Sequence, residues 1–180
     1  MLELSLHILD IVNNSIKAKA TKIVIEVNEQ ITKNLLSISI ADNGCGMDEE
    51  FLRNVTDPFK TTRTTRKVGM GLSMFKAAAE ATGGSLEISS EKNVGTTVLA
   101  TFVYDHIDRQ PIGNMPETML ILVCGNETVD FVYRHIKNDK EFLLETAQIK
   151  EILGDVSFSN PEISLWLKEY VEEGLEALNS

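Results

Sequence analysis

The sequence has few cysteines, few aromatic residues and no long apolar run. Its two cysteines, Cys45 and Cys124, are far apart and match no metal-binding spacing, so we expect free thiols rather than a disulfide framework. No apolar stretch approaches the roughly 20 residues that span a bilayer. The N-terminus also lacks the basic start and the cleavage site of a signal peptide. These absences predict a cytoplasmic protein without a membrane span.

Basic charge is also scarce, and it is unevenly distributed. The chain of 180 residues carries a net charge of -10, which argues against broad nucleic-acid binding. Up to Tyr104, 11 basic residues nearly balance 12 acidic ones, whereas the remainder has 6 basic and 15 acidic residues. This change in composition predicts a first domain over 1–104, a linker over 105–116 and an acidic extension of unknown role over 117–180.

The hydrophobic and charged fractions, 43% and 24%, are typical of a soluble globular chain with a core of its own. Apolar residues at helical spacing and helix-end signals predict helices over 4–20, 48–55 and 69–82. Alternating apolar residues predict strands over 22–28, 35–41, 85–90 and 96–103. The polar stretch 57–68 is expected to be a loop. This order predicts an α/β (α+β) two-layer sandwich, with helices over a mixed, mainly antiparallel sheet.

The C-terminal part is predicted to form a small α/β extension. Residues 114–124 fit either a helix or a buried strand, and the flanking caps, Asn114 and Gly125, favour the helix. A hairpin is expected over 129–146, and a final amphipathic helix is expected to begin at Pro161. The apolar core side of that helix is expected to contain Ile163, Trp166, Leu167, Tyr170 and Val171. The extension either continues the core, which we favour, or forms a free partner-binding domain.

The first predicted helix carries a polar pair. Asp10 and Asn14 are four residues apart and therefore point the same way. A carboxylate and an amide oxygen on one helix face suit a hard cation and a nearby proton transfer. Taken alone, the pair is better explained as the solvated face of an amphipathic helix.

Two glycine motifs follow. The segment Asp42-Asn-Gly44-Cys-Gly46-Met47 comes directly after a strand. Its glycines can bring the backbone close to a flat ligand, and its carboxylate can accept a hydrogen bond from an exocyclic amine. The segment Gly69-Met-Gly71 begins a predicted helix whose N-terminus suits an anion, after a basic loop that can supply cations for phosphate. Alone, each motif is better explained as an ordinary turn or a solvated loop.

Together, five motifs in fixed order resemble the ATP-binding domain shared by gyrase, the heat-shock chaperone of the same superfamily, histidine kinases and mismatch-repair ATPases (the GHKL superfamily). The segment Asp10 to Ala18 is similar to the N box, Asp42 to Met47 to the G1 box, and Gly69 to Leu72 to the G2 box. Pro58-Phe59-Lys-Thr-Thr resembles the kinase F box, and Gly95-Thr96 resembles the closing Gly-Thr pair. The resemblance covers the first predicted domain, and the acidic extension has no counterpart in it.

The resemblance implies ATP and Mg²⁺ as cofactors, with Asn14 holding the metal and Asp10 as the candidate catalytic base. Asp42 would accept a hydrogen bond from the adenine amine, helped by Thr96 through a water. A lid over about 57–71 would meet the phosphates with glycine amides and basic side chains. The expected cofactor-binding residues are Asn14, Lys17, Asp42, Gly44, Gly46, Met47, Phe59, Lys60, Lys67, Gly69, Met70, Gly71, Leu72 and Thr96.

Three features depart from the family pattern. Where this chain has Asp10, the ATPase branch has Glu and histidine kinases usually have Asn. Met70 and Ser73 stand where kinases commonly have Thr and Gly. The first motif lies near the start of the chain, which is expected to leave no room for an upstream segment bearing a phosphorylated histidine. The histidines, which we interpret as packing or surface residues, are His7, His106 and His135.

Two classes of function follow from these expectations. The first is an enzyme that binds Mg-ATP and passes the γ-phosphate to water or to a partner protein. Such a chain would be a stand-alone ATPase, a serine kinase of the anti-sigma-factor type, or the kinase half of a split two-component system. The alternative is a non-catalytic nucleotide-sensing module that docks a basic partner through its acidic C-terminal region. We expect ATP and a protein partner or phosphoacceptor, no nucleic acid, and leave a homodimer open.

Overall fold

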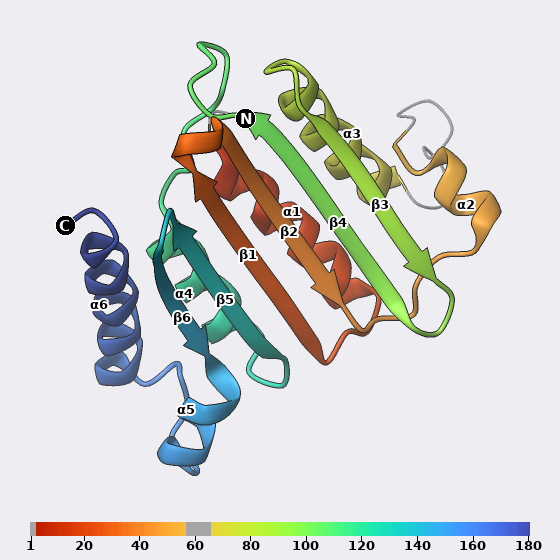
Figure 1. The fold of residues 1–180 in the computed structure, drawn as a ribbon. Helices are drawn as coiled ribbons and strands as arrows, with labels where there is room; N and C mark the ends of the chain where they lie inside the picture. Colours follow the sequence, from red (N-terminus) through yellow and green to blue (C-terminus); the bar gives the residue numbers. More distant parts are fainter. Residues whose placement is uncertain (1–2, 57–65) are drawn as a thin grey trace.

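The computed structural model describes residues 3–56 and 66–180, with the backbone alone for 66–70. Six strands form one sheet in the order β3-β4-β2-β1-β5-β6 (Figure 1). The strands are β1 (Lys22–Gln30), β2 (Leu35–Asp42), β3 (Ser85–Glu91), β4 (Gly95–Val103), β5 (Asp130–Lys137) and β6 (Lys140–Glu145). All neighbouring strands are antiparallel except β1 and β5, which run parallel. The predicted mixed, mainly antiparallel sheet is confirmed.

Helices cover one face of the sheet, as Figure 1 shows for α1, α3 and α4. The helices are α1 (Leu4–Lys17), α2 (Glu49–Asn54), α3 (Arg66–Glu80), α4 (Met115–Gly125), α5 (Thr146–Leu153) and α6 (Pro161–Ala177), with a 3-10 turn over Ile31–Lys33. The side chains of Asn114 and Asn160 accept hydrogen bonds from backbone N–H groups in the first turns of α4 and α6. Helix α4 confirms the helix between the two alternatives for 114–124; Asn114 caps it as predicted, but Gly125 is its last residue and Asn126 is its C-cap. No helix in the described part of the chain could cross a membrane.

Periodic apolar side chains build the core between the two layers. Ile23, Ile25 and Val27 alternate along β1 and are completely buried. Ile8 and Val12 of α1 are also completely buried against this face of the sheet. Each such burial contributes about 1.5–3 kcal/mol to folding. Apolar residues thus recur every two positions in the strand and about every four in the helix. These repeats place one apolar face on each layer, and the two faces pack together.

The C-terminal part continues this core. Strand β5 pairs in parallel with β1 from Lys22 opposite Asp130 to Glu29 opposite Lys137. The buried side chains of α4, β5, β6 and α6 belong to the same hydrophobic cluster as those of α1 and β1. The sheet therefore runs without a break from the first hundred residues into the acidic extension.

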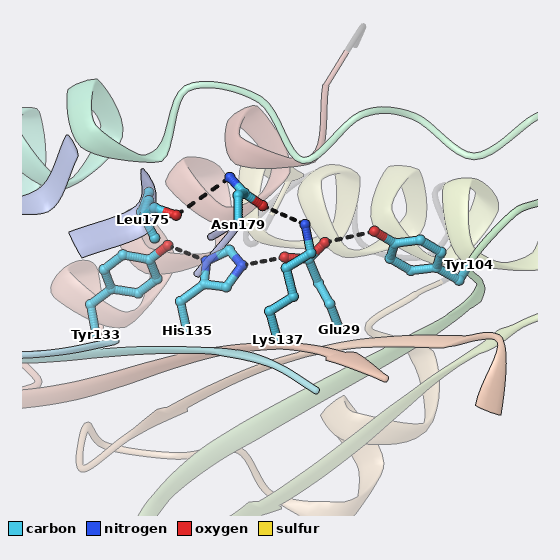
Figure 2. Close-up of polar contacts among 7 residues, drawn as sticks. All are labelled: Glu29, Tyr104, Tyr133, His135, Lys137, Leu175 and Asn179. Atoms are coloured by element: carbon cyan, nitrogen blue, oxygen red, sulfur yellow. Dashed lines mark hydrogen bonds and ion pairs between the residues drawn. The ribbon is translucent and has the colours of Figure 1, made fainter. Parts of the chain in front are cut away.

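A buried polar cluster links β1, β5 and the segment after β4 (Figure 2). The Glu29 carboxylate accepts hydrogen bonds of 2.6 Å from Nε2 of His135 and of 2.9 Å from the Tyr104 hydroxyl. Nδ1 of His135 lies 2.7 Å from the Tyr133 hydroxyl. Burial raises the pKa of the Glu29 carboxyl, but the two hydrogen bonds and the attraction of His135 and Lys137 outweigh it and hold that pKa below the ordinary 4.5. Glu29 is therefore an ionised carboxylate, and its hydrogen bonds connect β5 to β1 and to the segment after β4.

The helices differ most from the sequence-based prediction at α1, α3 and α5. Helix α1 ends at Lys17 rather than Ala20, because Lys19 adopts a left-handed backbone with φ of 66°. Helix α3 begins at Arg66, so the predicted helix start at Gly69 was wrong. Glycine inside a helix costs only about 1 kcal/mol, and the neighbouring residues tolerate helix well. Helix α5 was not predicted, since it follows β6 without an intervening loop.

The apolar side of α6 is only partly buried. Leu167 and Val171 are completely buried, as predicted. Trp166 and Tyr170 are 44% and 39% exposed, so their prediction as core residues was wrong. An amphipathic stripe is wider than the contact that one neighbouring surface can make with it. The periodicity therefore located the stripe but not the part of it that the core covers.

Candidate functional site

The Asp42 carboxylate lies at the end of β2, opposite Thr96 near the start of β4. Its Oδ2 accepts a hydrogen bond of 2.6 Å from the Ser15 hydroxyl, and its Oδ1 accepts one of 2.8 Å from the backbone N–H of Gly44. These two donors fix the orientation of the carboxylate, and each oxygen keeps a lone pair for a further donor. The arrangement suits recognition of an amine in one defined position.

The Thr96 hydroxyl belongs to a second fixed set of polar groups beside Asp42. It lies 2.8 Å from the Ser90 hydroxyl. Ser90 Oγ also accepts a hydrogen bond of 2.8 Å from the backbone N–H of Met47. Ser90 therefore couples the glycine turn after β2 to the adjacent ends of β3 and β4. Neither Ser90 nor Ser15 was predicted as a site residue.

The turn after β2 needs its glycines because it passes directly against other backbone. Gly46 has a φ of 68°, and a Cβ there would lie 2.0 Å from the carbonyl oxygen of Glu91. A Cβ on Gly44 would lie 2.8 Å from the carbonyl oxygen of Ala18. That carbonyl also accepts a hydrogen bond of 2.8 Å from the N–H of Cys45. The turn is therefore held between the end of α1 and the β3–β4 hairpin.

A cavity of about 250 Å³ opens beside this turn. Apolar side chains form most of its wall, and Asp42 provides a carboxylate. Such a combination of apolar walls and a few fixed polar groups is typical of a small-molecule or cofactor site. The cavity is lined by Ile11, Asn14, Ser15, Lys17, Ala18, Asp42, Cys45, Gly46, Met47, Phe51, Leu72, Thr96 and Val98. The structure therefore brings together seven of the predicted cofactor-binding residues: Asn14, Lys17, Asp42, Gly46, Met47, Leu72 and Thr96.

Helix α3 approaches the polar pair of α1 at Gly71. A Cβ on Gly71 would lie 3.7 Å from both Nδ2 of Asn14 and Cβ of Asp10. The N-box and G2-box segments, which are far apart in the sequence, therefore lie side by side. Gly71 is the sixth residue of α3, so its N–H is not among the first four that a helix leaves free. The sequence predicted that the Gly71 N–H would be free at the start of a helix. This prediction was wrong, because Gly71 lies inside α3.

The Asn14 side chain fits a role in holding Mg²⁺. Its Nδ2 is buried and has no hydrogen-bond partner among the described residues, so this donor is available to a phosphate oxygen while the amide oxygen of the same side chain is available to a cation. Mg²⁺ at a nucleotide takes one or two protein oxygens together with phosphate oxygens and waters. The amide oxygen of Asn14 would supply one such protein oxygen, and the Asp10 carboxylate one turn away would stay available for proton transfer. Within residues 3–56 and 66–180, no three His, Cys, Asp or Glu side chains form an alternative metal site.

The remaining predicted residues lie outside the described residues or in the part of α3 whose side chains are not described. Phe59 and Lys60 fall outside the described residues. Lys67, Gly69 and Met70 fall within α3, but their side chains are not described. Their expected contacts with the phosphates stay predictions.

The two buried histidines serve packing, as expected. His7 stacks on Phe75 with 5.3 Å between ring centroids, and its Nε2 lies 3.1 Å from the Gln110 side-chain oxygen. Burial lowers the pKa of His7 and outweighs the hydrogen bond to Gln110, which raises it. His135 belongs to the Glu29 cluster of Figure 2. Both cysteines are free thiols, and Cys45 lines the cavity.

Comparison with known protein families shows which family this sequence matches. The model of histidine kinase-, DNA gyrase B- and HSP90-like ATPases matches residues 2–106. The sensor histidine kinase YvrG of Bacillus subtilis is 29% identical over 97 residues, which are 52% of this chain and 17% of that kinase. The signal transduction histidine-protein kinase AtoS of Escherichia coli is 31% identical over 91 residues, which are 50% of this chain and 15% of that kinase. The chain thus covers less than a fifth of the length of these relatives.

A structural comparison supports the same fold. The crystal structure of the N-terminal domain of a DNA repair protein matches with a TM-score of 0.58 and 18% identity, over 81% of this chain and 53% of that chain. At this identity the likeness concerns the fold alone. The family match spans more than half of the chain and contains the whole lining of the cavity. The chain therefore belongs to the histidine kinase-, DNA gyrase B- and HSP90-like ATPases, with an ATP-binding domain of the histidine-kinase type.

Proposed function

We propose that this chain binds Mg-ATP in the cavity beside Asp42 and either hydrolyses it or transfers its γ-phosphate to a partner protein. The observation that carries the proposal is the Asp42 carboxylate, held by Ser15 and the Gly44 N–H at the wall of an apolar cavity. The adenine ring would lie between the apolar walls. Its amine would donate to Asp42, and Thr96 would take part through a water.

The phosphates would extend toward α3 and the polar pair of α1. The oxygen of Asn14 would hold Mg²⁺, which would neutralise phosphate charge. Lys17 at the cavity, with Lys60 and Lys67, would add positive charge. The amide of Gly71 would reach a phosphate only if the first turns of α3 unwind, because the helix occupies that N–H. We therefore infer that nucleotide binding rearranges the start of α3.

Asp10 is the candidate general base. It lies one turn from Asn14 on α1 and close to Gly71 of α3. Among the described residues it has no hydrogen-bond or ion-pair partner, so its carboxylate is not committed to a structural contact. A carboxylate in this place can orient and deprotonate a water or a hydroxyl that attacks the γ-phosphate.

The test follows labelled γ-phosphate from Mg-ATP while ATP affinity is measured separately. We expect Asp10→Asn to reduce phosphate release or transfer about 100-fold, because a general base contributes on that order, and to leave ATP affinity within about twofold. Asp42→Asn should instead weaken ATP binding about tenfold or more through the lost charge-assisted hydrogen bond. Glu80→Gln, an exposed carboxylate at the end of α3, is the matched control and should change neither quantity.

The second candidate is a nucleotide-sensing module without turnover. The acidic surface of the C-terminal part favours it, since such a surface can dock a partner without any catalysis. Saturable ATP binding with no phosphate release and no transfer to any added protein, in wild type as in Asp10→Asn, would refute hydrolysis by this chain and leave two candidates, the sensing module and transfer to a specific partner protein.

A further inference from the structure

A shallow groove of about 210 Å³ lies between β6, α5 and α6, and we call it the α5–α6 groove. Its apolar lining consists of Leu143, Ile149, Ile152, Trp166 and Tyr170. Ile152 is 85% exposed and Trp166 is 44% exposed. Leu143 and Tyr170 are exposed as well, so four exposed large apolar side chains gather at one groove, a feature that is common at protein–protein contact sites.

The two aromatic rings of the groove are held in place before any partner arrives. Trp166 and Tyr170 stack with 5.3 Å between centroids and an interplanar angle of 20°. The Tyr170 hydroxyl donates to the carbonyl of Leu143 at 3.3 Å, and its ring lies 5.4 Å from that of Phe142. At Gly174 the helix approaches so closely that a Cβ would lie 2.1 Å from the Phe142 ring. Rigid aromatic side chains lose little entropy on binding.

Acidic side chains flank the rings on the same side of α6. Glu162, Glu169 and Glu173 are exposed and lie three or four residues from Trp166 or Tyr170. None of these three carboxylates forms an ion pair with a described residue. The groove therefore combines exposed aromatic rings with unneutralised negative charge.

We propose that the α5–α6 groove docks a cationic amphipathic segment of a partner protein. Lysine or arginine side chains of that segment stack on Trp166 and Tyr170 and pair with the flanking carboxylates, while its apolar side chains enter the groove. Nucleic acids and anionic membranes carry the wrong charge. A second copy of this chain would bring a net charge of -10. The groove shares no lining residue with the nucleotide cavity, so the inference does not depend on ATP turnover.

Trp166 is the only tryptophan of the chain, so its fluorescence reports on the groove directly. The probe is a synthetic helical peptide of about 18 residues, five turns long, with leucine on one face and lysine and arginine on the other. We expect a saturable change in emission whose half-point rises with salt, and no change with the same peptide carrying glutamate for every basic residue. Absence of saturable binding by the basic peptide would overturn the proposal.

Charge-matched variants separate the groove from the net charge of the protein. Glu169→Lys with Glu173→Lys should weaken peptide binding about tenfold, because two attractive contacts become repulsive. Glu80→Lys with Glu87→Lys makes the same change in net charge at exposed sites away from the groove and should weaken binding less than about twofold. Equal losses in the two variants would overturn the proposal. Dimerisation of the unliganded protein that buries Trp166 would also overturn it, by assigning the groove to a second copy.

Discussion

The cavity beside Asp42 and the α5–α6 groove present opposite kinds of surface. In the cavity the polar groups already bond to one another, Asp42 to Ser15 and Gly44, and Thr96 to Ser90. At the groove the flanking carboxylates are exposed and form no ion pair with a described residue. We expect the Asp42 end of the cavity to select its ligand by fixed geometry, and the groove to attract its partner by charge. The contribution of the Asp42 end to affinity should therefore depend on small changes of shape, and affinity at the groove on salt.

The strongest test of this comparison replaces one glycine in each region. Gly46→Ala places a Cβ in a left-handed backbone against the carbonyl of Glu91, which we expect to cost about 3–5 kcal/mol of the free energy of unfolding. ATP binding should be lost and peptide binding kept. A Cβ in Gly174→Ala meets the Phe142 ring first, a side chain rather than backbone, so α6 should shift at a cost of about 1–2 kcal/mol, with weaker peptide binding and unchanged ATP affinity.

Denaturant titration, ATP titration and peptide titration of both variants provide the measurements. Gly125→Ala is the control, since a Cβ there would meet no atom within 4 Å. Loss of both activities in both variants would show that the two regions are not independent. A Gly174→Ala protein more stable than wild type would show that α6 does not approach β6 so closely.

The elements that the sequence predicted best are those whose pattern is local. Alternation predicted β1 and β2, and the caps at Asn114 and Asn160 located α4 and α6. The parallel pairing of β1 with β5 has no local signal, because it joins segments about a hundred residues apart. For the same reason the sequence did not predict that Glu29 and His135 would meet.

The site shows the same limit. Asp42 and its glycines were predictable from the motif, since the turn demands them locally. Ser15 and Ser90 were not, because a serine hydroxyl acquires a role only when a third element brings it an acceptor. The sequence did hold a signal for Ser15. Ser15 directly follows Asn14 of the N box, so a position near the cavity could have been predicted for it. Ser90 lies near the end of β3, outside all the motifs, so the sequence holds no comparable signal for it.

The buried Glu29 cluster, which links β1 to β5, makes the stability of the protein depend on pH. Its hydrogen bonds hold the pKa of Glu29 below 4.5, so the carboxylate contributes stability that is complete above that value and is lost as pH falls through the lower native pKa. We expect Glu29→Gln to destabilise the protein by about 2–3 kcal/mol at about pH 7. The difference from wild type should hold down to about pH 5.5 and narrow below 4.5.

Urea unfolding at several pH values measures this difference. Glu26→Gln is the matched control on the same strand, since Glu26 is half-exposed and pairs with Arg134 on the open face. Its effect should stay below about 1 kcal/mol. A gap between Glu29→Gln and wild type that widens in acid would contradict the assignment of an ionised, stabilising Glu29.

The smallest effect that we predict concerns the pairing of polar groups within the cavity itself. Ser15→Ala removes the 2.6 Å hydrogen bond to Asp42 and leaves the Gly44 N–H as the remaining donor. The carboxylate should turn more freely, which at about 1 kcal/mol for one hydrogen bond corresponds to about fivefold weaker ATP binding. Ser37→Ala, on the open face of β2, should leave ATP affinity unchanged. Because the loss comes from geometry, its size should not vary with salt, whereas peptide affinity at the α5–α6 groove should fall steadily over the same salt range. A salt-dependent loss for Ser15→Ala would mean that the cavity also attracts its ligand chiefly by charge, and the contrast between the two surfaces would fail.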